Sequence, residues 1–149
     1  MRAADFVRKW GPGGSAHDLS ERAGAQTHFI DLCRLLGVAE PGDPERYCFE
    51  RGLTKTGSAA GRTDGFADVW KRDFFAWEYK GRDKDLRAAY VQLMGYKDDL
   101  GNPPLLVVSD IARIEIHTNF TGLSPVVKVI TLDDLAADAG RAGPFELGE

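Results

Sequence analysis

Two aromatic-rich segments on either side of a short polar turn do most to limit the folds open to this chain of 149 residues. Phe66–Lys71 and Phe74–Lys80 have the length and composition of β-strands, and Arg72-Asp73 lies between them. This pattern predicts a hairpin of two antiparallel strands. Because strand side chains alternate between faces, the aromatic residues of the second segment share one face, which we expect to lie in the core. They are Phe75, Trp77 and Tyr79.

Helical and strand patterns surround the hairpin and predict a single domain of the α/β class. In chain order we predict a helix from about Leu19 to Leu36, a strand at Tyr47–Leu53, the hairpin, a helix from about Asp85 to Leu100, strands at Leu105–Ser109 and Ile114–Thr118, a candidate strand at Val126–Thr131 and a candidate helix from Leu132. Residues 1–17 are assigned to an N-terminal extension with a short apolar turn, residues 18–140 to the folded domain, and residues 141–149 to a tail or the start of a linker.

The net charge of −4 argues against general binding to polyanions, but the charges are unevenly distributed. From Arg51 to Tyr90 there are nine Lys and Arg residues against six Asp and Glu residues, whereas the rest of the chain has ten against seventeen. A locally basic middle is compatible with phosphate contacts at one face, although ordinary solvated charge is the default explanation.

Nothing in the sequence indicates a membrane protein or a secreted protein. The longest aliphatic run, Leu105–Val108, has four residues, and a membrane span needs about 20. The N-terminus lacks the apolar stretch of a secretion signal. Cys33 and Cys48 lie among apolar residues without a C-x-x-C spacing, so we interpret them as reduced core residues. The sequence therefore predicts a cytoplasmic protein with no membrane partner.

The second face of the hairpin gathers charged side chains. With a turn centred on Asp73, Asp68 lies directly opposite Glu78, and opposed residues have Cβ atoms about 4.5–5.5 Å apart. Lys80 shares this face with Glu78 because strand side chains have a period of two. Two carboxylates this close repel each other unless a cation lies between them, and their oxygen atoms favour Mg²⁺, which keeps several waters in its shell. The backbone carbonyl of Tyr79 offers a further oxygen.

These groups together indicate hydrolysis of a phosphodiester bond. A metal held by the carboxylates can polarise a scissile phosphate and lower the pKa of a bound water. Lys80 would position or deprotonate that water, or neutralise the charge that grows on the phosphate. On spacing alone, an exposed hairpin with a cross-strand salt bridge is the alternative.

The surrounding sequence favours the first of these interpretations. Phe66–Lys71 followed by Phe75–Gly81 resembles the PD-(D/E)XK endonuclease motif, with Ala67 in place of its proline. More narrowly, the chain resembles the N-terminal nuclease domain of MmeI-like bifunctional restriction-modification enzymes of types IIG and IIL, which couple a DNA endonuclease to an adenine DNA methyltransferase. Further matching segments are His28–Gly37, Tyr47–Glu50, Ala89–Leu93, Asn102–Asp110 and Ile114–Thr121. The resemblance runs roughly from Phe6 to Leu135.

This resemblance implies a restriction-endonuclease-like fold, a mixed β-sheet flanked by helices in the order α-β-β-β-α-β-β. It implies that Asp68 and Glu78 are the metal carboxylates and that Lys80 is the catalytic lysine. The implied cofactor is Mg²⁺, for which we expect Mn²⁺ to substitute.

Other residues take supporting roles in this resemblance. Gln92 and Tyr96 lie four apart on the second helix and resemble a Q-x-x-x-Y element that supports the site and nearby DNA; an ordinary surface amide is the alternative for Gln92. Glu21 is a candidate third acidic group or an N-terminal helix cap. Candidate DNA phosphate contacts, each alternatively a solvated charge, are Lys71, Arg82, Lys84 and Arg87. The histidines, His17, His28 and His117, lack metal-ligand spacing and are interpreted as structural.

The implied partner is double-stranded DNA. The chain has no Gly-rich S-adenosylmethionine loop and no Asn-Pro-Pro-Tyr motif, so the methyltransferase domain, its S-adenosylmethionine and the target-recognition domain are expected outside these residues. We therefore expect weak, sequence-independent DNA binding and slow or undetectable cleavage by this domain alone. The alternative function is a catalytically silent DNA-binding or docking module of a DNA methyltransferase. No particular oligomeric state follows from the sequence.

Overall fold

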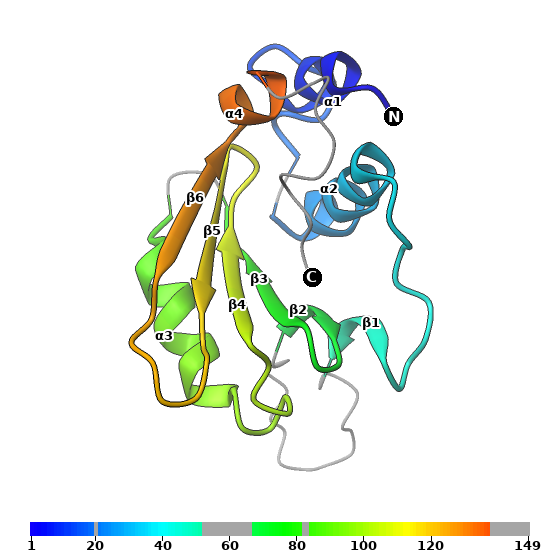
Figure 1. Ribbon diagram of the computed structural model, residues 1–149. Coiled ribbons are helices and arrows are strands. Elements are labelled where there is room, and N and C mark those ends of the chain that lie inside the picture. Colours follow the sequence, from blue (N-terminus) through cyan, green and yellow to red (C-terminus); the bar gives the residue numbers. More distant parts are fainter. Residues whose placement is uncertain (20, 52–66, 82–83, 138–149) are drawn as a thin grey trace.

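The computed structural model describes residues 1–19, 21–51, 67–81 and 84–137 (Figure 1). Within them, one sheet has the strand order β1-β2-β3-β4-β5-β6, so neighbours in the sheet are also neighbours in the chain. The strands are β1 Tyr47–Arg51, β2 Ala67–Lys71, β3 Phe75–Tyr79, β4 Leu105–Ser109, β5 Arg113–Thr118 and β6 Val127–Thr131. The helices are α1 Ala3–Trp10, α2 Glu21–Leu36, α3 Leu86–Tyr96 and α4 Leu132–Ala137. The predicted fold class, a mixed α/β sheet flanked by helices, is confirmed.

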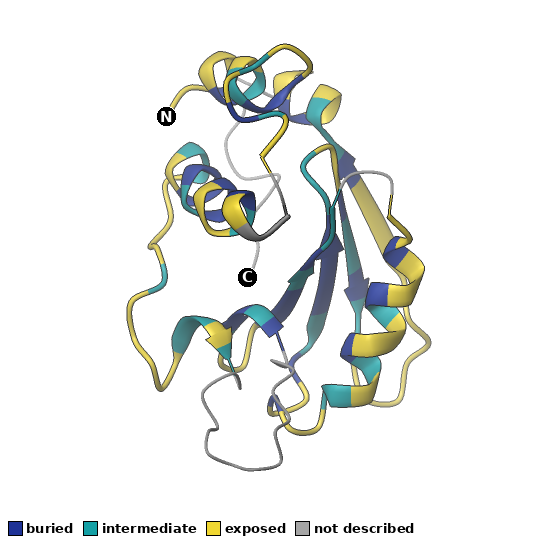
Figure 2. Ribbon diagram, turned by 180° about the vertical axis from the view of Figure 1, so that it is seen from behind, coloured by how far each residue is buried: buried dark blue, intermediate teal, exposed yellow. Residues whose placement is uncertain are grey.

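Helices cover both faces of the central strands (Figures 1 and 2). β3 and β4 run parallel, and every other adjacent pair in the described sheet is antiparallel. A parallel pair needs a crossover connection, and α3 supplies it and packs on both strands. α2 lies over the opposite face, and α1 packs against α2 and α4 beyond one end of the sheet.

Two hydrophobic clusters fill the layers on either side of the sheet. The cluster under α2 includes Phe6, Trp10, Phe29, Leu32, Val69, Phe75, Trp77, Tyr79, Val107, Ile114 and Leu135. The cluster under α3 includes Ala67, Trp70, Ala76, Leu86, Ala89, Leu93, Leu100, Leu106 and Val108. Successive residues of β3 enter opposite clusters, as a period of two requires. The predicted core face of the hairpin is therefore confirmed.

Local sequence signals explain the start of α3, which ends at Tyr96 and is followed by turns, so it ends four residues earlier than predicted. The Asp85 carboxylate accepts a hydrogen bond from the backbone N–H of Arg87 at 2.9 Å and so caps the first turn. The residues that the helix buries at helical spacing are Leu86, Ala89 and Leu93. Past the helix, Gly101 has a φ of 83°, a left-handed conformation that glycine adopts without strain. The chain can therefore turn back there and enter β4.

The observed order adds α1, β6 and α4 to the predicted order α-β-β-β-α-β-β. Only a short apolar turn is predicted around Phe6 and Trp10, because an eight-residue helix offers too little periodicity. In the structure both side chains are fully buried. β6 and α4 correspond to the candidate elements near the C-terminus. β6 exposes Val127 and Val129, so it lacks the alternation of a half-buried strand.

Some predictions fall outside the described residues. These are the end of the strand at 47–53, the start of the hairpin at 66, and the tail at 141–149. In the described part, Cys33 and Cys48 are free thiols, as predicted. None of the described helices is long and apolar enough to cross a membrane.

Candidate active site

The β2–β3 hairpin has the predicted register. Its backbone pairs are Val69↔Trp77, Trp70↔Ala76 and Lys71↔Phe75. Phe74 donates its N–H to the Lys71 carbonyl at 3.0 Å, and Asp73 adopts a φ of 69°, which Asp tolerates better than most residues other than glycine. The turn therefore sets the register of the hairpin. In this register Asp68 and Glu78 are the opposed residues that follow the Val69↔Trp77 pair.

Asp68 and Glu78 lie on the α3 side of the sheet, just past the last backbone pair of the hairpin. Each is two residues from a member of the α3-side cluster, Trp70 on β2 and Ala76 on β3, so strand alternation gives both the same face. Both side chains are half-buried. The Asp68 carboxylate reaches across to β3, where Oδ2 accepts the backbone N–H of Tyr79 at 2.7 Å. A side chain thus links the strands where their backbone pairing ends.

Lys80 directly follows β3. Its backbone N–H donates to the Ser109 carbonyl at 2.8 Å, which extends the parallel pairing of β3 and β4 by one residue. By alternation Lys80 shares the face of Glu78, and it is also half-buried. The three predicted site residues are therefore brought together at one end of the central strands.

Between Glu78 and Lys80, Tyr79 points to the opposite layer. Its hydroxyl lies 2.8 Å from Nδ1 of His28 on α2, and both residues are buried. The His28 ring contacts Trp10 and Phe6 of α1 edge-on, at centroid distances of 4.9 Å and 5.3 Å. His28 is predicted from the sequence to be structural, but its contact with Tyr79 is not predicted. The available signal is that His28 precedes Leu32 by four residues and so lies on the buried stripe of α2.

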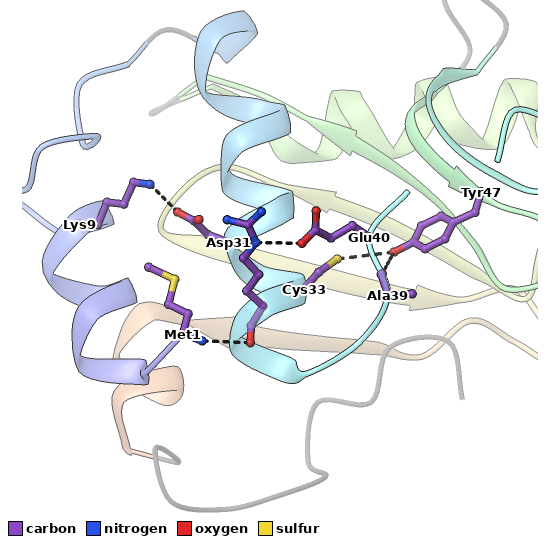
Figure 3. A network of polar contacts seen from close by, with 8 residues as sticks. Met1, Lys9, Asp31, Cys33, Ala39, Glu40 and Tyr47 are labelled. Atoms are coloured by element: carbon purple, nitrogen blue, oxygen red, sulfur yellow. Dashed lines mark hydrogen bonds and ion pairs between the residues drawn. The ribbon is translucent and has the colours of Figure 1, made fainter. Parts of the chain in front are cut away.

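A polar pair holds α1 on α2 beside this ring. Trp10 donates its Nε1–H to Oδ2 of Asp31 at 2.9 Å, and the same oxygen lies 2.8 Å from the Lys9 ammonium. Figure 3 shows the Lys9–Asp31 contact between the two helices. The Asp31 side chain is only 8 % exposed, so it carries its charge in the interior with both a cation and an indole N–H as partners.

Burial keeps His28 and Tyr79 neutral. Loss of hydration lowers the pKa of His28 to about 4, against the opposing effect of the Asp31 charge. Burial likewise raises the pKa of the Tyr79 hydroxyl well above its ordinary value. Their hydrogen bond therefore joins two uncharged groups at neutral pH.

The depressed pKa of His28 predicts acid sensitivity. The unfolded chain protonates this histidine below about pH 6.5, whereas the folded chain does so only near pH 4. The contribution of the neutral His28 to the free energy of unfolding is therefore complete above pH 6.5 and is lost as the pH falls toward 4. Urea unfolding in the presence of a metal chelator measures this effect. Between pH 6.5 and pH 4, the free energy of unfolding of the unaltered chain should fall by about 3 kcal/mol more than that of His28→Gln. Equal pH dependence of the two proteins would contradict this expectation.

The other predicted site residues lie around this end of the sheet or farther away. Lys84 and Arg87 are exposed at the start of α3, and Gln92 is exposed two turns along, with the half-buried Tyr96 one turn beyond it. Glu21 is the first residue of α2, but its side chain lies outside the described part, as does Arg82.

Lys71 lies at the other end of β2, beside the hairpin turn. Its ammonium lies over the rings of Tyr47 and Phe74, at 5.1 Å and 4.6 Å from their centroids. It lies three positions after Asp68, which corresponds to about 10 Å along a strand. It is therefore remote from the paired carboxylates.

The donor set determines which metal the site could hold. Among the described residues, no three His, Cys, Asp or Glu side chains gather in the manner of a closed metal site. Asp68 and Glu78 supply carboxylate oxygens from adjacent strands. Mg²⁺ prefers oxygen ligands and is commonly bound by one or two carboxylates while it keeps several waters. The residues present fit this ion better than Zn²⁺, which favours nitrogen and sulfur.

Comparisons with known proteins identify relatives of the chain. The family described as "MmeI, N-terminal domain" matches residues 1–148. No curated protein matches the sequence. A cryo-EM structure of a DrdV–DNA complex is similar, with a TM-score of 0.43 and 14 % sequence identity; the match covers 97 % of this chain and 14 % of that one. The chain thus spans about one seventh of the length of that solved chain.

Proposed function

Because the chain belongs to the family of MmeI N-terminal domains, we propose that it is the metal-dependent DNA endonuclease domain of a restriction-modification enzyme. The observation that carries the proposal is the shared face of Asp68 and Glu78, next to Lys80, at the end of two adjacent strands. This arrangement of two carboxylates and a lysine resembles the PD-(D/E)XK motif.

The proposed site divides the chemistry among its residues. Asp68, Glu78 and the Tyr79 backbone carbonyl would hold Mg²⁺ or Mn²⁺. When bound, such an ion supplies charge stabilisation to a phosphodiester and acidifies a coordinated water. Lys80 orients the attacking water or neutralises the growing charge on the phosphate.

Double-stranded DNA is the proposed substrate. Lys84 and Arg87 are exposed at the start of α3, on the connection that follows Lys80, and are the described residues to which we assign phosphate contacts. With a net charge of −4, the chain lacks the dense cationic surface that tight phosphate binding needs. We assign sequence recognition, the methyltransferase and its S-adenosylmethionine to other domains of the full enzyme.

The Asp68 carboxylate provides the direct test. Asp68→Asn removes the negative charge while the side chain can still accept the Tyr79 N–H, so the hairpin should stay folded. Calorimetric titration should show that the unaltered chain binds Mn²⁺. In Asp68→Asn and Asp68→Ala the Mn²⁺ affinity should fall by more than the roughly 10–100-fold that follows the loss of an outer-shell partner.

Asp99→Ala is the matched control. Asp99 is an exposed carboxylate beyond α3, so its loss should leave Mn²⁺ affinity unchanged. If the unaltered chain and both Asp68 variants bound Mn²⁺ equally, the endonuclease proposal would be wrong. The catalytically silent DNA-binding or docking module would then be the better explanation.

A further inference from the structure

Tyr79 is held at both of its ends. Its backbone N–H donates to Oδ2 of Asp68 at 2.7 Å, and its hydroxyl lies 2.8 Å from Nδ1 of His28. The ring stacks on Trp77 at a centroid distance of 5.8 Å and an interplanar angle of 21°. This one residue therefore connects the candidate site on the α3 side of the sheet with the helical layer on the other side.

His28 contacts the Tyr79 hydroxyl, and three further residues contact His28 directly or through Trp10; we call these four residues the Tyr79 anchor. They are Phe6, Trp10, His28 and Asp31, with exposed fractions of 0 %, 0 %, 1 % and 6 %. Phe6 and Trp10 confine the His28 ring edge-on, and Asp31 fixes Trp10 through its indole N–H. The anchor thus leaves the His28 ring little freedom to turn away from Tyr79.

The position of the anchor gives it a specific consequence. Among the described residues, the last backbone pair between β2 and β3 is Val69↔Trp77, and beyond it the Asp68–Tyr79 contact links the two strands. Because Glu78 and Lys80 flank Tyr79 and face the other way, a change in the Tyr79 backbone would redirect both side chains. The same change would displace the N–H that holds Asp68.

We propose that His28 is a positioning residue for the metal-binding carboxylates: by holding the Tyr79 hydroxyl, it fixes the backbone that orients Asp68 and Glu78. This inference rests on the proposed function and deepens it, because it extends the site through the sheet to α2 and α1. His28 itself does not contact substrate.

The test compares Mn²⁺ affinity in three variants. Tyr79→Phe keeps the ring and removes the hydroxyl, whereas His28→Leu removes the ring nitrogen and keeps an apolar side chain. Each should weaken Mn²⁺ binding roughly tenfold, as the loss of an outer-shell partner does. His28→Gln, whose amide can still bond the hydroxyl, should retain most of the affinity.

Tyr47→Phe is the matched control. The Tyr47 hydroxyl donates to the Ala39 carbonyl at 2.8 Å in the connection between α2 and β1 (Figure 3). Its removal is the same chemical change at a position remote from Asp68, and Mn²⁺ affinity should remain that of the unaltered chain. A similar loss in Tyr47→Phe and Tyr79→Phe would overturn the inference.

The double variant His28→Leu/Tyr79→Phe separates positioning from general stability. It removes both polar partners, so its melting temperature should recover relative to His28→Leu, which leaves a buried hydroxyl without a partner. The Mn²⁺ affinity of the double variant should nevertheless stay roughly tenfold below that of the unaltered chain. Affinity that recovered along with the melting temperature would overturn the positioning role.

The outcomes for His28 and for the metal site are distinguishable. If Asp68→Asn abolishes Mn²⁺ binding but Tyr79→Phe binds like the unaltered chain, the inference fails and the proposed function stands. If the unaltered chain does not bind Mn²⁺, or Asp68→Asn binds equally well, both fail.

Discussion

Lys80→Ala is expected to slow DNA cleavage by roughly 10²–10⁴-fold, the usual contribution of a positioned acid or base, without weakening Mn²⁺ binding. The two effects separate because Lys80 is a cation and acts on water or phosphate, whereas the metal is held by the carboxylates. The backbone at Lys80 is fixed by its bond to Ser109, so alanine should leave the end of β3 in place.

Cleavage is best measured with the chain fused to a sequence-specific DNA-binding module, because tethering raises the effective DNA concentration that the isolated domain lacks. Lys128→Ala is the matched control: Lys128 is exposed on β6, at the edge of the sheet far from β2, and carries the same charge. Cleavage by Lys80→Ala at the rate of the unaltered fusion would remove Lys80 from the mechanism.

Trp77→Ala is expected to lower the free energy of unfolding by about 3–5 kcal/mol. Trp77 is fully buried, lies 5.0 Å from the Phe29 ring centroid, and donates its indole N–H to the Ser109 hydroxyl at 2.9 Å. Alanine would leave a cavity between β3 and α2 and a buried hydroxyl without that donor. Domains of this kind are stable by only about 5–15 kcal/mol, so the variant should be largely unfolded on moderate warming.

Phe74→Ala provides the comparison, since Phe74 is an aromatic residue of the same hairpin that is 38 % exposed at the turn. Its loss removes the contact with the Lys71 ammonium and should cost about 1 kcal/mol or less. Urea unfolding followed by tryptophan fluorescence and circular dichroism measures both. Comparable losses in the two variants would mean that Trp77 does not anchor the core.

The hairpin and its faces could be predicted from sequence because short-range rules determine them. A tight turn at Arg72-Asp73 fixes the register, and a period of two then decides which residues share a face. The positions of Asp68 and Glu78 follow from these two rules alone. The spacing does not indicate which chemistry the pair performs, and the chemistry that we propose for it comes from the family resemblance.

The Tyr79 anchor could not be predicted because it depends on contacts between distant segments. His28 and Tyr79 are 51 residues apart, and Trp10 and Asp31 are 21 apart. Neither pair follows from a helical or strand period. The hydrogen bond from the Tyr79 N–H to Asp68 could not be predicted either. Strand pairing rules describe bonds between backbone groups, whereas here a side-chain carboxylate accepts the bond in place of a backbone carbonyl.

The agreement between sheet order and chain order bears on how the protein folds. Each strand pairs with the strand before it in the sequence, so contact order within the sheet is low and loop-closure entropy is modest, which favours rapid assembly. The packing of α1 on α4 is the exception, because it joins residues 3–10 to residues 132–137. During synthesis, α1 can complete its contacts with α4 only after residue 137 has been made. We therefore expect α1, the helix that confines His28, to complete its contacts after the strands that carry Asp68 and Glu78 have paired.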